Sequence, residues 1–193
     1  MDLRKRIRQK VLSQRNKLSF ENQEKKSKTI SEKILSLDQV VTSEVIFCYV
    51  SYKSEVNTKK IIARLIELGK TVAVPLTLEK EKKLLAVCIT DIDKDLTPGY
   101  CAIPEPKKEL LAKHCINPAK IDTIIIPGSV FDLGCGRMGY GGGFYDRFIA
   151  YQSPEALRIG VCFETQIVEE LKLEAHDKRM DIIVSEKRFL KRK

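Results

Sequence analysis

The segment with the clearest chemical potential is a glycine-rich run, FDLGCGRMGYGGGFYDR, at residues 131–147. Six of the ten positions from 134 to 143 are glycine. Without a Cβ atom, successive residues can adopt positive φ and turn their N–H groups toward one anion, and a helix that follows would add its N-terminal dipole. Arg137 adds a positive charge within the run. The run therefore predicts a phosphate-binding loop.

Three other interpretations of this segment are less well supported. A flexible surface loop would not account for the interleaved Arg137, Tyr140, Phe144 and Tyr145. A dinucleotide-binding fingerprint, G-x-G-x-x-G, matches residues 134–139 by letter, but it lies several residues past the preceding apolar run instead of directly after it. The P-loop is excluded because no Gly-Lys-Ser/Thr follows.

Two aspartates stand where they can serve bound phosphates. Asp146 follows the glycines at the start of a predicted helix, and Asp177 follows His176 in the loop before the last predicted strand. Mg²⁺ takes few protein oxygens and completes its octahedron with phosphate and water, so the pair is a candidate magnesium site. Taken singly, each aspartate fits a helix start or a turn equally well. His176 is given no role, since phosphoryl transfer needs positioning and charge neutralisation more than a base.

Three further charged residues have both a functional and an ordinary interpretation. Glu55 lies in a polar loop after an apolar run, where its carboxylate can accept hydrogen bonds from a ligand. A solvated loop acid is the simpler interpretation. Arg4 and Arg8 lie one helical turn apart and share a face, which suits either an anion site or a solvated helix.

The elements that must position these residues alternate along the chain. Strands are predicted at residues 45–50, 71–74, 84–89, 121–126, 158–163 and 181–184. Helices are predicted at residues 3–18, 19–37, 58–69, 142–151 and 164–171, with Ser19 and Thr58 as N-caps and Gly69 as a stop.

Most of these strands are apolar throughout rather than alternating, which is typical of a mostly parallel sheet with both faces covered. We therefore expect an α/β protein with one domain over residues 1–193. Ligands of such sheets bind beyond the carboxyl ends of the strands, which directs attention to residues 51–58, residues 127–146 and the stretch after residue 163.

Length and composition limit the class of protein. The chain has 193 residues, 43% hydrophobic and 32% charged, which is enough for a substantial core and too apolar for disorder. The longest apolar run is too short for a membrane span and the first residues are too charged for a signal peptide, so a cytoplasmic protein is expected. The six cysteines show no C-x-x-C pair, which indicates reduced thiols and no zinc site.

The net charge of +9 is concentrated at the two ends of the chain. Residues 1–17 and 187–193 together carry +11, so the remainder carries −2. A basic end can bind nucleic acid, but the aromatic and glycine spacing of RNA-binding modules is missing from both ends. A nucleic-acid partner is therefore disfavoured, and a local anion site is the alternative use of these cations.

Taken together, these motifs resemble the 5-formyltetrahydrofolate cyclo-ligase family, also called 5,10-methenyltetrahydrofolate synthetases. The resemblance extends over nearly the whole chain and rests on six segments in the expected order. They are RNKLS, IFCYVSYKSEVNT, GYCAIPEP, IIIPGSVFD, GRMGYGGGFYDR and HDKRMDIIVSE. The resemblance implies a three-layer α/β sandwich. It also implies an enzyme that uses ATP and Mg²⁺ to convert 5-formyltetrahydrofolate to 5,10-methenyltetrahydrofolate, with release of ADP and phosphate.

Carried over by position, the resemblance also implies the site. The nucleotide would be bound by the first helix and the glycine block, through Arg4, Arg8, Arg137, Met138, Gly139, Tyr140, Gly141, Gly142, Gly143, Phe144 and Tyr145. The folate would contact Val50, Glu55, Tyr140, Gly141, Gly142, Gly143 and Phe144. Asp146 and Asp177 would hold Mg²⁺, and Arg137 and Tyr145 would be catalytic.

Three positions depart from the family pattern. Arg4 stands where lysine is common, Met138 where leucine is common, and Phe144 where the family usually has the first tyrosine of a pair. The last change removes a hydroxyl group near the substrate. Two other functions stay open at this point: a basic RNA-binding protein, and a sugar-phosphate or coenzyme A enzyme on a similar scaffold.

Overall fold

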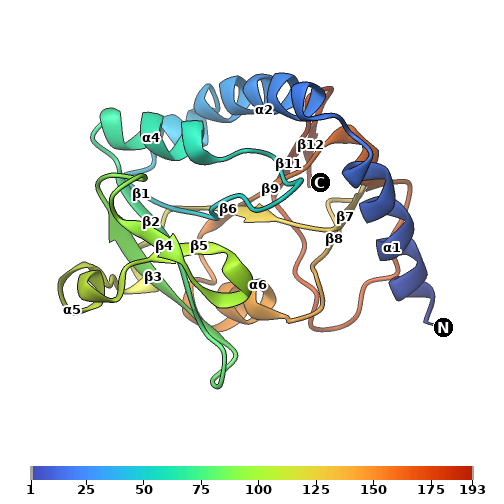
Figure 1. The fold of residues 1–193 in the computed structure, drawn as a ribbon. Helices are drawn as coiled ribbons and strands as arrows, with labels where there is room; N and C mark the ends of the chain where they lie inside the picture. Colours follow the sequence, from blue (N-terminus) through green and yellow to red (C-terminus); the bar gives the residue numbers. More distant parts are fainter. Residues whose placement is uncertain (1, 193) are drawn as a thin grey trace.

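A seven-stranded sheet forms the centre of the computed structural model, which describes residues 2–192 (Figure 1). Its strand order is β12-β11-β9-β6-β1-β2-β3. The five inner strands are parallel, while the edge strands β3 and β12 run antiparallel to their neighbours. The strands of this sheet are β1 (Val45–Cys48), β2 (Thr71–Leu78), β3 (Lys83–Ile89), β6 (Thr123–Pro127), β9 (Leu157–Val161), β11 (Ile182–Val184) and β12 (Phe189–Lys191).

Helices cover both faces of this sheet, so the predicted α/β class with three layers is confirmed (Figure 1). The long helices α2 and α4 lie on one face, and α6 lies on the other (Figure 1). The helices are α1 (Leu3–Asn16), α2 (Phe20–Leu35), α3 (Asp38–Thr42), α4 (Lys59–Glu67), α5 (Leu111–His114) and α6 (Phe144–Arg147). No helix within residues 2–192 has the length and apolarity that a membrane span needs.

Alternate residues of the strands point into two separate cores. Ile46 and Cys48 of β1 pack with α2 and α4 on one face, whereas Phe47 packs on the opposite face. Phe47 stacks on Phe148 with ring centroids 4.5 Å apart. Because both faces are apolar, strands such as β1 and β6 carry continuous apolar runs, as the sequence indicates.

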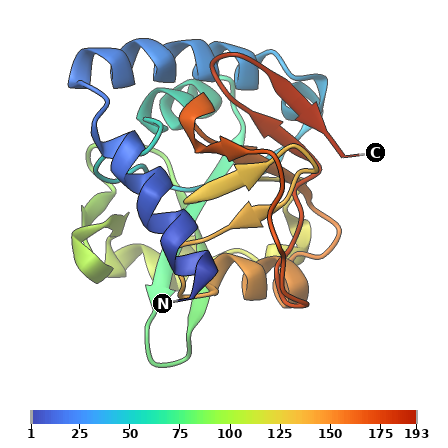
Figure 2. The same cartoon turned by 90° about the vertical axis from the view of Figure 1, so that its right-hand side faces the viewer.

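The first helix lies apart from these layers, across a small second sheet (Figure 2). That sheet has the order β10-β7-β8 and consists of β7 (Val130–Asp132), β8 (Arg137–Met138) and β10 (Ile167–Val168). Val11 of α1 packs with Val130 and Met138 in a separate apolar cluster. A third pair, β4 (Leu96–Pro98) with β5 (Pro104–Pro106), precedes α5. Helix α1 is therefore fixed to the glycine-rich segment, which contains β8.

Several predicted boundaries are confirmed and others are wrong. Ser19 caps α2 through its side chain, and Gly69 follows α4 with φ of +75°. Strand β2 continues through Pro75, because Pro75 lies past Ala73, the last residue of β2 that pairs with β1. The missing N–H of Pro75 therefore leaves no parallel ladder bond unmade.

The predicted helix at residues 142–151 is present with shifted ends and an irregular second half, whereas the predicted helix at residues 164–171 is wrong. Helix α6 begins only at Phe144 and widens into a π-helical turn at Phe148–Gln152, which lets Phe148 and Ile149 both pack against the sheet. The second predicted helix is a 3-10 turn, Glu164–Gln166, followed by β10. The basic end of the chain forms the edge strand β12, where charges protect an exposed sheet edge.

Gly160 on β9 offers a test of the packing on the face of the sheet that α6 covers. A Cβ atom there would lie 2.6 Å from the Phe131 ring and 2.9 Å from Met180. Gly160→Ala should lower the free energy of unfolding by about 1 to 3 kcal/mol, measured by urea denaturation. Gly134→Ala is the matched control, because its nearest neighbour is the movable tip of Arg179. Equal midpoints for both variants would contradict this packing.

Candidate active site

The glycine-rich segment leaves the sheet at the carboxyl end of β6. It forms the β7–β8 hairpin and then turns through Gly139–Gly143 into α6. Of the six glycines in this loop, Gly141 and Gly143 have positive φ, at +109° and +65°, and the non-glycine Cys135 has φ of +61°. Gly136 is needed for another reason, since its Cβ would lie 2.6 Å from the Asp132 carboxylate.

Arg137, the charge within the run, is buried beneath this turn. Its Nη2 donates to Asp146 Oδ1 at 2.9 Å and its Nη1 donates to the Pro127 carbonyl oxygen at 3.1 Å. The guanidinium also lies 5.9 Å from the centre of the Tyr145 ring. Its Nε has no hydrogen-bond partner within residues 2–192. A buried cation with a spare donor, next to a glycine turn, is suited to an anion brought in by a ligand.

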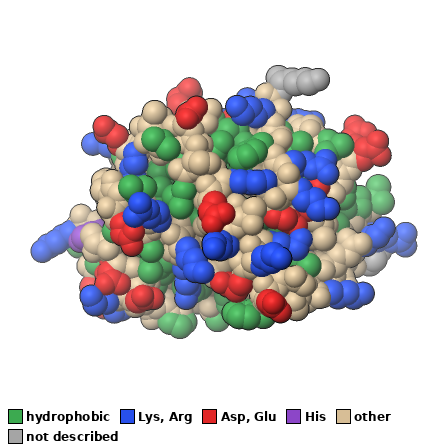
Figure 3. Space-filling model, turned by 90° about the horizontal axis from the view of Figure 1, so that it is seen from above, with side chains coloured by type: hydrophobic (Ala, Val, Ile, Leu, Met, Phe, Trp, Pro, Cys, Tyr) green, Lys and Arg blue, Asp and Glu red, His purple; other side chains and the backbone are tan. Residues whose placement is uncertain are grey.

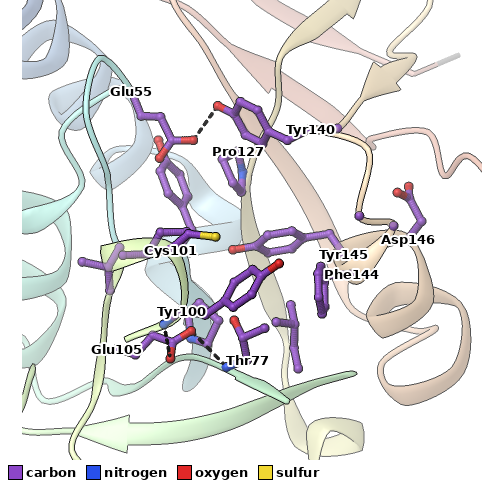
Figure 4. Close-up of a pocket in the computed structure, with 18 of the residues that line it drawn as sticks. Glu55, Thr77, Tyr100, Cys101, Glu105, Pro127, Tyr140, Phe144, Tyr145 and Asp146 are labelled. Atoms are coloured by element: carbon purple, nitrogen blue, oxygen red, sulfur yellow. Dashed lines mark hydrogen bonds between the residues drawn. The ribbon is translucent and has the colours of Figure 1, made fainter. Parts of the chain in front are cut away.

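A cavity of about 400 Å³ opens between the glycine turn and the β2–β3 side of the sheet (Figure 4). Val50, Glu55, Tyr140, Gly142, Gly143 and Phe144 of the predicted folate set line it, and Gly141 does not. Gly139, Tyr145 and Arg137 also line it. The opposite wall was missed by the sequence analysis and includes Thr77, Leu84, Tyr100, Cys101 and Ile103. Three of these residues, Tyr100, Cys101 and Ile103, belong to GYCAIPEP, one of the segments that carry the family resemblance.

Glu55 lies on a loop that is fixed at both ends. Thr58, expected as a helix cap, makes no capping bond to α4 and instead donates to the Tyr49 carbonyl oxygen at 2.7 Å. Tyr49 donates through its hydroxyl to the Val56 carbonyl oxygen at 2.9 Å. These bonds tie the loop to the end of β1, so the Glu55 carboxylate is held at the cavity wall (Figure 4).

The Glu55 carboxylate has two partners within the protein. Its Oε2 accepts from the Tyr52 N–H at 3.0 Å. Its Oε1 accepts from the Tyr140 hydroxyl, as Figure 4 shows. Burial raises the pKa of Glu55, while these two hydrogen bonds and the charge of Arg15 counteract part of the rise. The carboxylate keeps lone pairs free for a ligand in the cavity.

A second cavity, of about 590 Å³, lies on the other side of the glycine turn. It shares Gly142, Gly143 and Asp146 with the first cavity and is also lined by Gly141. Most of its charged side chains are basic, namely Lys82, Arg147 and Lys178. Two ligands, one in each cavity, would therefore meet at the same glycine turn.

The two arginines of α1 approach the turn from a third side. Arg8 donates through Nε to the Gly139 carbonyl oxygen at 3.0 Å. Its Nη1 lies 3.8 Å from the place of a Cβ at Gly141. Arg4 pairs with Asp177 at 2.7 Å and with Glu174 at 3.4 Å. Arg8 thus reaches the predicted loop, whereas Arg4 is held by a carboxylate in this structure.

The two predicted metal ligands come from segments that touch each other. The N–H of Lys178, next to Asp177, donates to Asp146 Oδ1 at 3.3 Å. Asp146 Oδ2 has no protein partner in residues 2–192, whereas both oxygens of Asp177 accept from Arg4. No group of three or more possible metal ligands occurs in that range. This donor set fits Mg²⁺ held mainly by phosphate and water, with Asp146 as its first protein anchor.

Two other predicted residues differ in their placement. Tyr145 projects into the first cavity, and burial raises its pKa, so the phenol stays protonated and can donate a hydrogen bond (Figure 4). Met138 is buried in the cluster under α1 and lines neither cavity. Phe144 packs near Tyr100, with ring centroids 6.1 Å apart, where a family tyrosine would bring a hydroxyl.

Comparisons with known proteins agree over most of the chain. Residues 1–186 match the profile of the 5-formyltetrahydrofolate cyclo-ligase family. A probable 5-formyltetrahydrofolate cyclo-ligase of Caenorhabditis elegans is 26% identical, over 96% of this chain and 93% of its own length. The 5-formyltetrahydrofolate cyclo-ligase of Escherichia coli K12 is 25% identical, over 91% and 96%.

A solved structure shows the same fold. The NMR structure of Aquifex aeolicus 5,10-methenyltetrahydrofolate synthetase superposes with a TM-score of 0.86 and 27% identity, covering 98% of this chain and 93% of the other. The profile match and this superposition confirm the resemblance found in the motifs. This chain therefore belongs to the 5-formyltetrahydrofolate cyclo-ligase family of enzymes.

Proposed function

We propose that this protein converts 5-formyltetrahydrofolate to 5,10-methenyltetrahydrofolate, using ATP and Mg²⁺ and releasing ADP and phosphate. The observation that supports this most directly is the glycine turn shared by two cavities, Gly142–Gly143 with Asp146. An enzyme that transfers a phosphoryl group between two small molecules needs both of them at one point. The expected partners are therefore ATP and the folate, in the cytoplasm.

The proposed reaction has two steps. A formamide oxygen is a poor leaving group, so it first attacks the γ-phosphorus of ATP, forming the O–P bond of an iminium phosphate while ADP leaves. The neighbouring amine nitrogen of the same folate then attacks the formyl carbon. The C–O bond breaks, phosphate departs with the former formyl oxygen, the amine proton is lost and the methenyl bridge is complete. No covalent enzyme intermediate is required.

The chain's own groups would position the phosphates and neutralise their charge. Residues 139–143 each line one or both cavities, and their backbone N–H groups would serve as donors to phosphate. Arg137 beneath the turn has an Nε with no hydrogen-bond partner in residues 2–192. Arg8 lies beside the turn, and Arg4 joins it if its pairing with Asp177 is exchanged for phosphate. Tyr145 can donate to a developing charge from the folate side. Positioning and charge stabilisation are the main needs of phosphoryl transfer.

The proposed metal site and folate site are also assigned from the residues that lie at the cavities. Asp146 and Asp177 would hold Mg²⁺, which neutralises phosphate charge when it is bound. The first cavity, with Val50, Glu55, Tyr140 and Phe144 in its wall, is the proposed folate pocket. Its apolar sides suit a flat ring, and Glu55 suits ring N–H donors.

The decisive experiment follows the methenyl chromophore. Purified protein with 5-formyltetrahydrofolate and Mg-ATP should form the methenyl absorbance with one ADP and one phosphate per turnover, and omission of ATP or chelation of Mg²⁺ should abolish it. A protein that forms no chromophore but binds RNA with a steep salt dependence would overturn the proposal in favour of a nucleic-acid-binding protein.

Glu55→Gln should weaken 5-formyltetrahydrofolate binding by about ten- to a hundredfold, because the ring N–H donors of the folate would lose a charged acceptor in a closed pocket. ATP affinity should stay the same. Calorimetry with each ligand on the folded variant measures both. Glu32→Gln is the matched control, since Glu32 is exposed on α2 and lines neither cavity. A selective loss of ATP affinity would assign Glu55 to the other ligand.

A further inference from the structure

Arg15 is a buried cation that neither the motifs nor the proposed reaction explains. It lies in the last turn of α1 with 6% of its surface exposed. Its Nε donates to Ser54 Oγ at 3.0 Å, and its Nη1 donates to the Tyr140 hydroxyl oxygen at 2.7 Å. No ion pair to Arg15 occurs within residues 2–192. Burial of an unpaired cation is unfavourable, so a negative charge near Arg15 is expected to stabilise it.

That source is one hydrogen bond further on, at Glu55. The Tyr140 hydroxyl accepts from Arg15 and therefore directs its single proton elsewhere, toward Glu55 Oε1. The guanidinium also lies 5.7 Å from the centre of the Tyr140 ring, where it faces the aromatic π-system. Arg15, Tyr140 and Glu55 thus form one chain of contacts from α1 through the glycine-rich loop to the first cavity.

This chain of contacts holds one oxygen of the Glu55 carboxylate, and the loop backbone holds the other. Oε1 is held by Tyr140 and Oε2 by the Tyr52 N–H, and the carboxylate's remaining lone pairs serve the cavity. Tyr140 itself is half-exposed, with 47% of its surface accessible, so its ring needs a partner to stay in one orientation. Arg15 supplies that partner by a hydrogen bond and by its charge.

We propose that Arg15 is a positioning residue for folate recognition, which orients the Tyr140 hydroxyl so that an ionised Glu55 faces the ligand. The proposal rests on the assignment of the first cavity to the folate. It adds a residue of α1 that touches neither ligand, and it explains why a buried arginine is surrounded by hydroxyl groups. The same helix carries Arg4 and Arg8, so α1 would contribute to both ligand sites.

A double-mutant cycle separates this role from general stabilisation of the fold. Arg15→Gln should raise the KM for 5-formyltetrahydrofolate by about tenfold and leave the KM for ATP unchanged. Tyr140→Phe should have a similar effect on the folate KM. The double variant should be no worse than the worse single variant, because both changes break the same connection. Arg6→Gln, an exposed arginine on the same helix, is the matched control.

A pH profile provides the second readout. The groups that face Glu55 are Arg15, Tyr140, Tyr49 and Tyr145, of which only Arg15 is charged at neutral pH. Loss of that charge lets burial raise the pKa of Glu55 further, so the acid limb of kcat/KM for the folate should move to higher pH in Arg15→Gln. Arg15→Lys keeps the charge and should return the limb toward its wild-type position.

The outcomes are distinct from those for the proposed function. A wild-type protein without methenyl formation overturns the function itself. If the wild type is active, the positioning role is overturned by any of three results: an unchanged folate KM in Arg15→Gln, additive effects in the cycle, or equal losses for folate and ATP that track a lower melting temperature. An acid limb in Arg15→Lys that moves as far as in Arg15→Gln overturns the role of the charge.

Discussion

Replacing Arg137 with alanine should lower the rate of methenyl formation by roughly two to four orders of magnitude, the range for loss of a charge-stabilising group in phosphoryl transfer. The guanidinium lies under the glycine turn that both cavities share, with one donor unused by residues 2–192. Initial rates at saturating ATP and folate, on protein whose circular dichroism is unchanged, give the measurement.

The burial of Arg137 adds a second expected effect. Truncation leaves Asp146 as a buried carboxylate without its ion pair, so the variant should also lose about 3 to 5 kcal/mol of stability. Assays at low temperature and with Arg137→Lys guard against simple unfolding. Lysine keeps a charge but cannot serve Asp146 and Pro127 together, so its rate should still fall at least about tenfold.

Arg179→Ala is the control for Arg137, because Arg179 contacts the same loop at the Gly134 carbonyl oxygen and lines neither cavity. Its rate should stay close to that of the wild type. Folded Arg137 variants with wild-type turnover and ATP affinity would remove this residue from the reaction and leave it with a structural role.

The second large effect concerns the metal. Asp146→Asn should raise the Mg²⁺ concentration for half-maximal rate by roughly a hundredfold. Loss of a residue that only hydrogen-bonds a metal ligand lowers metal affinity by about ten- to a hundredfold, and loss of the ligand's own charge should lower it at least as much. Asparagine retains an oxygen that can accept from Arg137, so the fold should persist. Folate binding measured without metal should change little. Titration of Mg²⁺ against the initial rate provides the test.

Asp177→Asn should act in the same direction as Asp146→Asn. Burial raises the pKa of Asp177, but the hydrogen bonds from Arg4 and from the Glu174 N–H, together with the charge of Arg4, bring this pKa below its usual value. The substitution therefore also frees Arg4, so the ATP affinity of this variant should be measured separately. Asp93→Asn, at an exposed position outside both cavities, is the control. Unchanged Mg²⁺ curves for both active-site variants would exclude these aspartates as ligands.

Local patterns in the sequence were enough to predict the α/β class and most of the main strands. Strands such as β1 and β6 are buried on both faces, so their apolar runs are visible without knowledge of the neighbours. Ser19 and Gly69 mark helix ends through their own chemistry. The glycine block indicated a phosphate site because a dense run of glycines has few other uses.

Other features depended on contacts between distant segments. Strand β12 has exposed side chains and exists because β11 pairs with it. The sequence identified Arg137 only as a charge within the glycine-rich run, whereas its burial and its bonds to Asp146 and the Pro127 carbonyl oxygen depend on the tertiary structure. Arg15 is one of seven basic residues in the first seventeen and begins the RNKLS segment of the resemblance, but neither pattern indicated a role for its side chain.

The connection of Arg15 to Glu55 passes through Tyr140, which is 85 positions away from Glu55 in the chain. Periodicity and propensity describe residues within a few turns of one another, so they predicted the parts of this site separately. Only the packing of α1 across the glycine-rich loop, and of that loop beside the end of β1, brought the three side chains together, because hydrogen bonds act over about 3 Å regardless of sequence distance.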